Sequence, residues 1–384
     1  MNRVDFAVIG AGVNGLSAAW ALARRKAGRI ALIERFDLGH DRGSSHGQSR
    51  ITRSAYVDAD YVRLMQVAHH EVWPALEAEA GERLIHPVPG AFFGPPGEPF
   101  DAYLRAADAA TMAMERLSPA EARKRFPLLR FPQAETVLVD PSAGIVAAER
   151  TMRALARLVM DAGVEVRPRT PVERIEVHPS HVAVHTAQGI VECGKVIVTA
   201  GAWAGRLLPW LAPALHVARQ TVGYFELDAP DSLQAPGLFP VWAWLAPDDG
   251  DGLRAYGLPV FGRPGIKLAR HITHGADDDP DAVPDAIAPS ALAALKTLVA
   301  LLFDAPIRRL ASWQTCLYTN TATSDPMLAL HPDEPRIVIG AGFSGHGFKL
   351  GPLTGRVLAD LAMEGECRLP AFLRARQRFA IAKG

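Results

Sequence analysis

A short glycine-rich segment near the start of the chain limits the possible folds more than any other feature. Gly10-Ala-Gly12-Val-Asn-Gly15 follows the apolar run Phe6–Ile9 and precedes an Ala- and Leu-rich stretch with helical spacing, 14–25. The G-x-G-x-x-G spacing between a strand and a helix is typical of a dinucleotide-binding turn. Gly10 permits the tight turn, Gly12 lets a pyrophosphate approach the backbone, and Gly15 lets helix and strand pack closely. The segment therefore predicts a βαβ unit and an α/β fold.

The end of the second expected strand indicates which dinucleotide is bound. Ile30–Ile33 runs into Glu34, whose carboxylate is placed to accept hydrogen bonds from adenosine ribose hydroxyls. A carboxylate there disfavours a 2′-phosphate, so FAD or NAD is favoured over NADP. A second glycine-rich loop, Gly340-Ala-Gly342-Phe-Ser-Gly345-His-Gly347-Phe-Lys349, follows an apolar strand near the other end of the chain. Two such loops indicate a long cofactor held at both halves, which FAD fits better than a nicotinamide cofactor.

Strands that end in glycine recur near the start, the middle and the end of the chain. We therefore expect a Rossmann-like FAD-binding domain assembled from segments 1–85, 147–218 and 320–384. Segments 86–146 and 219–319 are expected to form an inserted substrate domain built on an antiparallel sheet. Elsewhere the spacing of apolar residues predicts helices at 61–80, 120–130, 148–162 and 353–363, and strands at 164–166, 172–177, 181–185, 222–227, 241–246 and 253–258.

Composition excludes several classes of partner. Lys plus Arg and Asp plus Glu each number 41, so the net charge is zero and nothing favours nucleic acid. The apolar run 292–303 is too short to cross a bilayer; it predicts a half-buried helix with Ser290 as its N-cap and gives no reason to expect a membrane partner. The cysteines are widely spaced, which argues against disulfides and a metal site and favours a cytoplasmic location. They are Cys193, Cys316 and Cys367.

Two polar segments raise further site hypotheses. The loop 247–252 resembles part of a calcium loop but lacks the distal Glu ligand, so a solvated hairpin turn is expected instead. The stretch 43–53 places small residues beside His46, Arg50 and Arg53, which suits a loop that lies against a ring system and an anion. The same stretch could equally be a solvated basic loop.

Five stretches together resemble the monomeric sarcosine oxidase and N-methyltryptophan oxidase family of flavoproteins. They follow the family's order and span nearly the whole chain. The stretches are Gly-Ser-Ser-His-Gly-Gln-Ser-Arg-Ile-Thr-Arg-Ser-Ala-Tyr56, Val196-Ile-Val-Thr-Ala-Gly-Ala-Trp203, Gly265-Ile-Lys267-Leu, Thr315-Cys316-Leu-Tyr318 and Ala341-Gly-Phe-Ser-Gly-His-Gly-Phe-Lys349. The resemblance implies FAD-dependent oxidation of a secondary amine, an N-methyl or cyclic amino acid, to an imine. It also implies that O2 is reduced to hydrogen peroxide and that the protein is a monomer.

The resemblance assigns chemical roles to particular residues. It implies a thioether from Cys316 to the flavin 8α-methyl group, where the residue alone would read as a buried apolar cysteine. It places Lys267 beneath the flavin, where a fixed cation favours electron transfer to O2; a surface lysine at a strand end is the alternative. It assigns Arg53 and Lys349 to the substrate carboxylate, and Arg50 and His46 to the reactive edge of the flavin.

The remaining site residues follow from the same resemblance. Tyr256, His271 and Tyr318 are expected to shape the substrate pocket. Trp242 and Trp244 alternate on one strand and suit either a pocket or the core. The expected cofactor-binding residues are Gly10, Gly12, Gly15, Glu34, Ser44, Ser45, Val172, Gly201, Trp203, Cys316, Gly342, Gly345, Gly347 and Lys349.

Some features leave the substrate and the electron acceptor open. Ser44 stands where family members often carry a second histidine, and Arg270 replaces an aromatic residue before His271. A dehydrogenase that passes electrons to a carrier protein is a close alternative, against which Lys267 argues. A non-catalytic flavin-binding protein and the flavin half of a tRNA-modifying enzyme are more distant ones; the cationic site residues argue against the first and the zero net charge against the second.

Overall fold

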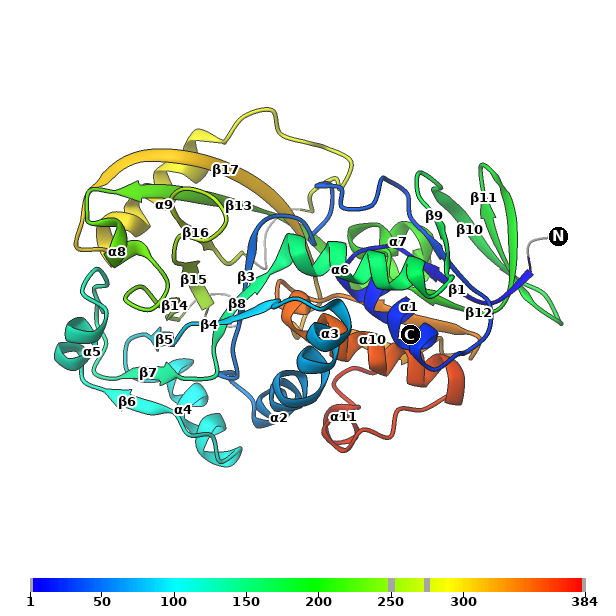
Figure 1. Cartoon of the computed structure of the whole chain (residues 1–384), viewed down its shortest axis with the longest axis horizontal. Helices are drawn as coiled ribbons and strands as arrows, with labels where there is room; N and C mark the ends of the chain where they lie inside the picture. The colour runs from blue at the N-terminus through cyan, green and yellow to red at the C-terminus, as the bar shows by residue number, and fades with distance from the viewer. Residues whose placement is uncertain (1–2, 248–252, 273–276, 382–384) are drawn as a thin grey trace.

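The fold is taken from a computed structural model that describes residues 3–247, 253–272 and 277–381. Within these residues the chain forms two eight-stranded sheets and a three-stranded sheet between them. Figure 1 shows the large sheets toward opposite ends of an elongated molecule. The turn expected at 247–252 lies outside the described residues from position 248 onward.

The first sheet has a parallel core assembled from strands far apart in the sequence. In spatial order these are β19 (Ile337–Ala341), β12 (Gly189–Val198), β1 (Arg3–Ile9), β2 (Ile30–Ile33) and β9 (Glu165–Arg167). Antiparallel strands extend it: β18 (Met327–Leu330) pairs with β19, and β10 (Val172–Val177) and β11 (Val182–Thr186) continue from the first half of β12. All four residues of β2 are buried, as expected for a strand covered on both faces.

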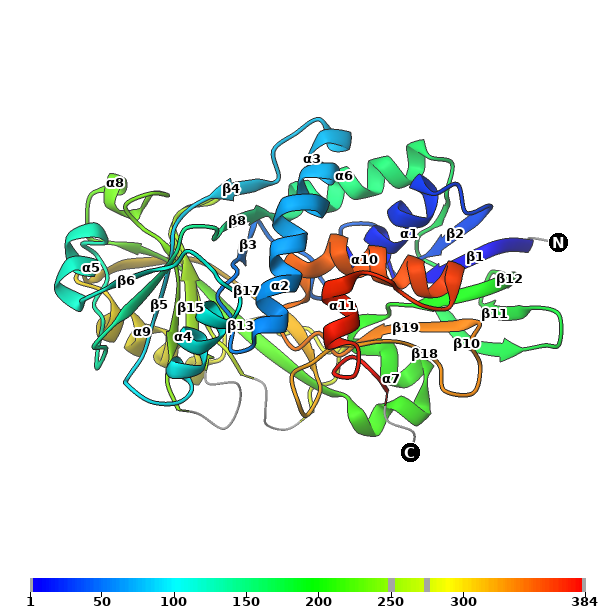
Figure 2. The ribbon, with the colours of Figure 1, turned by 90° about the horizontal axis from the view of Figure 1, so that it is seen from below.

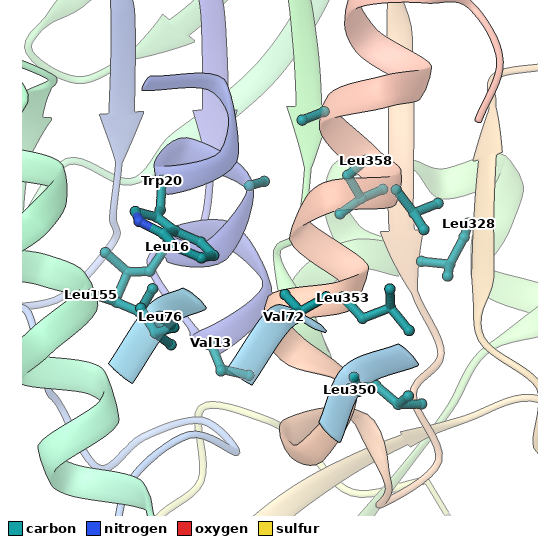
Figure 3. Packing of buried hydrophobic residues seen from close by; sticks show 14 of the residues in the cluster. Val13, Leu16, Trp20, Val72, Leu76, Leu155, Leu328, Leu350, Leu353 and Leu358 are labelled. Carbon is teal, nitrogen blue, oxygen red and sulfur yellow. The ribbon is translucent and has the colours of Figure 1, made fainter. Parts of the chain in front are cut away.

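Helices cover one face of this sheet and bury a large apolar cluster. The helices are α1 (Val13–Arg24), α6 (Ala148–Asp161) and α10 (Gly347–Glu364), which lie together in Figure 2. Val13, Leu16 and Trp20 of α1 lie between Leu155 of α6 and Leu353 of α10 in Figure 3. Each such side chain contributes about 1.5–3 kcal/mol on burial, so this packing holds the N-terminal and C-terminal segments together.

The helix expected at 61–80 is interrupted by a wider turn. It consists of α2 (Ala59–Val67), a π-helical turn (Ala68–Val72) and α3 (Trp73–Ala80). Pro74 follows the π-helical turn closely. It has no N–H to donate to a carbonyl of that turn, and its ring crowds the backbone there. A local widening relieves this crowding, and the simple helical spacing did not reveal it.

The second sheet is antiparallel apart from one pair of strands. Its order is β17 (Ile307–Asn320), β13 (His216–Leu227), β16 (Ile266–Arg270), β15 (Leu253–Leu258), β14 (Val241–Leu245), β5 (Gly90–Phe93), β7 (Val137–Asp140) and β6 (Glu115–Leu117), with β14 and β5 parallel. Helix α9 (Pro289–Leu302) packs against it. Trp242 is fully buried against Phe303, and Trp244 packs on the same cluster, so both tryptophans belong to the core.

The third sheet joins the two larger parts. It contains β3 (Ser49–Thr52), β8 (Gly144–Ala147) and β4 (Ile85–Pro87). The short helical elements are α4 (Phe100–Ala109), α5 (Pro119–Arg125), a 3-10 turn (Gly201–Trp203), α7 (Ala204–Leu207), a second 3-10 turn (Pro209–Ala214), α8 (Asp231–Gln234) and α11 (Pro370–Ala375). No helix within the described ranges is both long and apolar enough to span a bilayer.

Three helix boundaries differ from the sequence prediction. Helix α5 ends at Arg125 instead of 130. Helix α10 begins at Gly347 instead of 353, because Pro352 is accommodated inside the helix although proline favours the first turn. Helix α9 begins one residue before Ser290, and its N-cap is Ala288, so Ser290 is not the cap. The mixed α/β class is as expected. On the strand membership given above, we propose the domain boundaries stated in the sequence analysis.

Candidate active site

The first glycine-rich turn leaves no room for side chains. Gly10 has φ of +95°, and a Cβ atom there would lie 2.4 Å from the carbonyl oxygen of Thr199. A Cβ on Gly15 would lie 1.8 Å from the carbonyl oxygen of Gly10. Helix α1 starts after Gly12 and carries no acidic residue in its first turn. The N–H of Val13 donates to the Ser45 hydroxyl at 3.0 Å, and the N-terminal end of the helix with its positive dipole suits a bound phosphate.

Glu34 is held as an anion at the end of β2. Its carboxylate accepts hydrogen bonds from the N–H groups of Ala11 (2.6 Å) and Phe36 (2.9 Å). Burial alone would raise the pKa of Glu34, but His40 and these N–H groups lower it below its ordinary value. A buried carboxylate beside the phosphate turn suits ribose hydroxyls, which donate hydrogen bonds to it.

A single large cavity connects this turn with the second sheet. Its volume is about 990 Å³, at the upper end of the range for small-molecule sites. Gly15 and Lys267 do not line it. The other expected site residues all do: Gly10, Gly12, Glu34, Ser44, Ser45, His46, Arg50, Arg53, Val172, Gly201, Trp203, Tyr256, His271, Cys316, Tyr318, Gly342, Gly345, Gly347 and Lys349.

Arg50 organises the loop that precedes β3. Its guanidinium donates to the carbonyl oxygens of Ser44 (2.9 Å), His46 (2.6 Å) and Ser49 (2.9 Å). The Ser44 hydroxyl in turn donates to the carbonyl oxygen of Leu317 on β17. Burial, followed by the charge of Arg50, lowers the pKa of His46 to about 4, so this imidazole is neutral at pH 7. The loop is thus a fixed wall of the cavity with one permanent cation.

Lys267 lies behind this wall. The side chain is 2% exposed, and its Nζ donates a hydrogen bond of 2.6 Å to the carbonyl oxygen of Ser49. Burial, followed by the charge of Arg50, holds the pKa of Lys267 well below its ordinary range. Lys267 therefore lies beside the cavity wall, and it shares the carbonyl oxygen of Ser49 with Arg50 as a hydrogen-bond acceptor.

Cys316 lies on β17 at the cavity surface. Burial raises the pKa of its thiol, while the positive charges of Arg50 and Lys267 act in the opposite direction. Cys193 and Cys367 are also buried but do not line the cavity. Cys316 is thus the cysteine, among these three, that a ligand in the cavity can reach.

Two tyrosines and a histidine form the adjoining wall. The hydroxyl oxygens of Tyr256 and Tyr318 lie 3.3 Å apart, and the His271 ring lies 5.3 Å from the ring of Tyr318. A Cβ on Gly345 would lie 2.3 Å from the Tyr318 ring, so the second glycine loop closes directly on this wall. Burial is the main cause that raises the pKa of Tyr256 to about 12, and the charge of Cys316 adds to it. Burial is also the main cause that raises the pKa of Tyr318 well above its ordinary value, and Tyr256 adds to it. Both phenols are neutral at pH 7.

Arg53 and Lys349 both lie close to one aromatic ring, that of Tyr56. The guanidinium carbon of Arg53 lies 4.3 Å from the ring centroid of Tyr56, and the Nζ of Lys349 lies 5.4 Å from the same centroid. Both side chains are buried, with 6% and 7% exposed. The nearby Tyr61 and Tyr103 also line the cavity. No sequence pattern indicates a role for these tyrosines, although Tyr56 ends one of the stretches that carry the resemblance.

The residues present fit an extended FAD. The N-terminus of α1, which suits a phosphate, and the anionic Glu34 lie at one end of the cavity. Cys316 lies at the other end with the buried cations Arg53 and Lys349. Within the described residues, no group of His, Cys, Asp and Glu side chains is arranged to hold a metal ion. The fold and the cavity together define a flavin-dependent oxidoreductase.

Comparison with known proteins places the chain in a family. The profile of FAD dependent oxidoreductases matches residues 5–361, and the chain belongs to that family. It is 36% identical to human peroxisomal sarcosine oxidase (94% of this chain, 92% of the relative) and 34% identical to monomeric sarcosine oxidase of Bacillus sp. (94% and 93%). It is 29% identical to N-methyl-L-tryptophan oxidase of Yersinia pestis (94% and 95%).

A solved structure supports the fold. NikD, an amino acid oxidase of nikkomycin biosynthesis, superposes in its open form with a TM-score of 0.81 and 24% identity, over 99% of this chain and 98% of that one. The resemblance stated from the sequence is therefore confirmed. The fold class, the dependence on FAD and the assignment to amine oxidation are confirmed with it.

Proposed function

We propose that this protein oxidises the secondary amine of an N-methyl or cyclic amino acid to an imine and uses O2 as electron acceptor. The observation that carries the proposal is the pair Arg53 and Lys349, two buried cations that both lie close to the Tyr56 ring in the cavity that fits FAD. A guanidinium fork and an ammonium group suit a carboxylate. Anchoring the carboxylate also fixes which carbon of the substrate faces the flavin.

The substrate amine then lies against the wall formed by Tyr256, Tyr318 and His271. Tyr256, Tyr318 and His271 lie beside Cys316, and the hydroxyl groups of both tyrosines are neutral at pH 7. The buried cations of the site disfavour a protonated amine, because like charges repel. The amine therefore loses its proton to solvent as it binds, and no side chain needs to act as a strong base.

The other site residues have separate roles in the proposed reaction. When bound, FAD accepts a hydride equivalent from the substrate C–H bond and delivers two electrons to O2, which yields hydrogen peroxide. Arg50 and neutral His46 stabilise negative charge at the cavity wall, and Lys267 supplies positive charge for the reaction with O2. The imine product hydrolyses in water, and an N-methyl substrate thereby yields formaldehyde and the free amino acid.

Cys316 is the proposed point of covalent attachment of the flavin. Its place on the cavity surface, next to Arg50 and Lys267, supports this proposal, because cations stabilise the thiolate needed to form a thioether. We further propose a monomeric enzyme, as the names of two relatives describe those proteins. A cytoplasmic location stays a proposal that rests on the widely spaced cysteines.

An anaerobic substrate panel tests the proposed activity. Sarcosine, N-methyl-L-tryptophan and L-proline are each mixed with the oxidised protein without O2, and the loss of flavin absorbance is followed. At least one of them should bleach the flavin, and the corresponding amines without a carboxylate should not. Absence of bleaching by the whole panel would overturn the proposal in favour of a non-catalytic flavoprotein.

A dehydrogenase is the second candidate. It is favoured by the position of Lys267 behind the cavity wall and by its lowered pKa, because both reduce the positive charge available to O2. Mixing the reduced protein with O2 in a stopped-flow instrument decides between the two. Rapid reoxidation supports the oxidase, whereas slow reoxidation with fast transfer to an artificial acceptor supports the dehydrogenase.

A further inference from the structure

A π-helical turn contacts the two chain segments that carry the cations of the proposed carboxylate site, Arg53 and Lys349. The turn spans Ala68–Val72 and is continued by α3 from Trp73 onward. Such turns interrupt helices rarely and often occur at functional sites. The polar side chains at this turn contact both cation-bearing segments, which are about 300 residues apart in the sequence.

His69 holds the segment that carries Arg53. Its Nε2 shares a hydrogen bond of 2.6 Å with the hydroxyl of Thr52, and its Nδ1 lies 3.3 Å from the hydroxyl of Ser54. One imidazole therefore bridges the residues immediately before and after Arg53. Because each hydroxyl can donate or accept, a neutral ring satisfies both contacts in either tautomer.

A buried carboxylate fixes the same segment from the other side. Asp140 is fully buried and accepts from the N–H groups of Ser54 (2.7 Å) and Ala55 (3.0 Å). The hydroxyl of Ser142 donates to the hydroxyl of Ser54 at 2.9 Å. The backbone on both sides of Arg53 is thus tied down, and His69 provides the link to the helix.

Trp73 holds the segment that carries Lys349. Its indole Nε1–H donates a hydrogen bond of 2.9 Å to the carbonyl oxygen of Lys349, and the ring is 1% exposed. Trp73 follows His69 by four residues, so the wider turn sets the separation between their two contacts. The helix therefore bridges the two cation-bearing segments.

We propose that His69 and Trp73, through the π-helical turn, are positioning residues that set the spacing between Arg53 and Lys349 for one carboxylate. This inference rests on the proposed function of those two cations. Binding of a carboxylate by two cations tolerates displacements of only about 0.5 Å, so the supporting hydrogen bonds matter as much as the charges. His69 and Trp73 thus support recognition of the substrate without lining the cavity themselves.

The surroundings of His69 keep its imidazole ring, which bridges Thr52 and Ser54, uncharged. Burial lowers the pKa of His69 to about 4; Asp140 opposes this shift, while His70 and Lys349 add to it. The imidazole is therefore neutral throughout the range in which an amino acid oxidase is assayed. A neutral ring holds both hydroxyls without adding a third cation to the pocket.

The test uses the flavin-loaded protein and four variants. His69→Ala removes both contacts, His69→Gln retains an amide near the position of Nε2, and Trp73→Phe removes only the indole N–H. His70→Gln, at the exposed neighbour in the same turn, is the control. Acetate, a carboxylate that cannot be oxidised, is titrated while flavin absorbance is recorded, with acetamide as the uncharged comparison. The thermal unfolding midpoint of each variant is measured alongside.

The expected results separate positioning from general stability. His69→Ala and Trp73→Phe should each weaken acetate binding about tenfold, the effect of one lost hydrogen bond to a buried group. KM for the amino acid should rise by a similar factor with kcat within about twofold. His69→Gln should recover part of the loss, and His70→Gln should match the wild type. In an Arg53→Lys background, His69→Ala should have little further effect, because it acts through Arg53.

Other outcomes would overturn the inference. Unchanged acetate binding in His69→Ala and Trp73→Phe, or losses that add fully to that of Arg53→Lys, would show that the turn is merely structural. If His69→Ala unfolds, His69→Gln and Trp73→Phe decide the question by the same titration. A wild-type protein that does not bind acetate would instead remove the proposed function of Arg53 and Lys349, and this inference with it.

Discussion

The Nζ of Lys267 lies 2.6 Å from the backbone carbonyl oxygen of Ser49, to which it donates a hydrogen bond. The guanidinium of Arg50 donates to the same oxygen at 2.9 Å. Two cations therefore converge on one carbonyl where strand β16 of the second sheet meets strand β3. Positive potential is concentrated behind the cavity wall that carries Cys316, and the predictions for the flavin follow from this arrangement.

Replacing Lys267 should slow the reaction with O2 without slowing reduction of the flavin by substrate. In Lys267→Met the rate of reoxidation should fall about 10²-fold, as for loss of one charge-stabilising group in an active site. Stopped-flow absorbance after anaerobic reduction measures the two steps separately. Lys296→Met, at an exposed position on α9, is the control and should behave as the wild type. Equal slowing of both steps would contradict the assigned role.

Replacing Cys316 should release the flavin. Acid-denatured wild-type protein should keep yellow, fluorescent material on the polypeptide, whereas Cys316→Ser should lose it to the supernatant. Cys193→Ser, a substitution of a buried cysteine on β12 away from the cavity, should retain it. A wild-type protein that releases its flavin on denaturation would show that no thioether is present.

Removing the charge of Lys349 should weaken substrate binding selectively. A hydrogen bond to a charged group contributes about 1.5–3 kcal/mol, so Lys349→Met should raise KM for a carboxylate substrate roughly 10- to 100-fold. KM for a matching amine without the carboxylate should change little. Lys124→Met, at an exposed position on α5, serves as the matched control. Equal effects on both substrates would rule out a specific contact with the carboxylate.

Two half-buried histidines, His46 and His69, should make the protein sensitive to mild acid. The pKa values of His46 and His69 are lowered to about 4 in the folded state, against 6.5 as the reference value. The unfolded chain therefore binds more protons between pH 6.5 and 4, so the free energy of unfolding falls as pH decreases through this window. Each histidine accounts for a loss of ~3 kcal/mol at most. Urea unfolding at pH 7 and pH 4.5 measures it, and His69→Gln should reduce the loss; an unchanged loss would contradict the assignment.

Much of the nucleotide-binding part could be predicted because its determinants are local. Gly10, Gly15 and Glu34 lie within 25 residues of one another, and sterics and hydrogen bonding dictate these residue types in that order. The π-helical turn could not be predicted, because the apolar spacing of 61–80 is compatible with a continuous helix. The start of α10 was placed too late, since proline at position 352 normally marks a first turn.

The substrate end of the site depends on contacts between distant segments. Tyr61 and Tyr103 reach the cavity from α2 and α4, and no pattern within either helix indicates this. The resemblance implies that Lys267 lies beneath the flavin, and this stays a prediction. The hydrogen bond from Lys267 to the carbonyl oxygen of Ser49 depends on the packing of β16 against β3, which no local motif indicates. Sequence motifs thus predict residue types for the site, and the tertiary structure determines which of them line the cavity.

Electron density for crystals of the flavin-loaded protein grown with acetate tests the central claim most directly. We predict the flavin ring in the cavity, continuous density between its 8α carbon and the Sγ of Cys316, and acetate bound between Arg53 and Lys349. A flavin ring seated elsewhere, or acetate absent from this pair while Lys349 points to bulk solvent, would contradict the account.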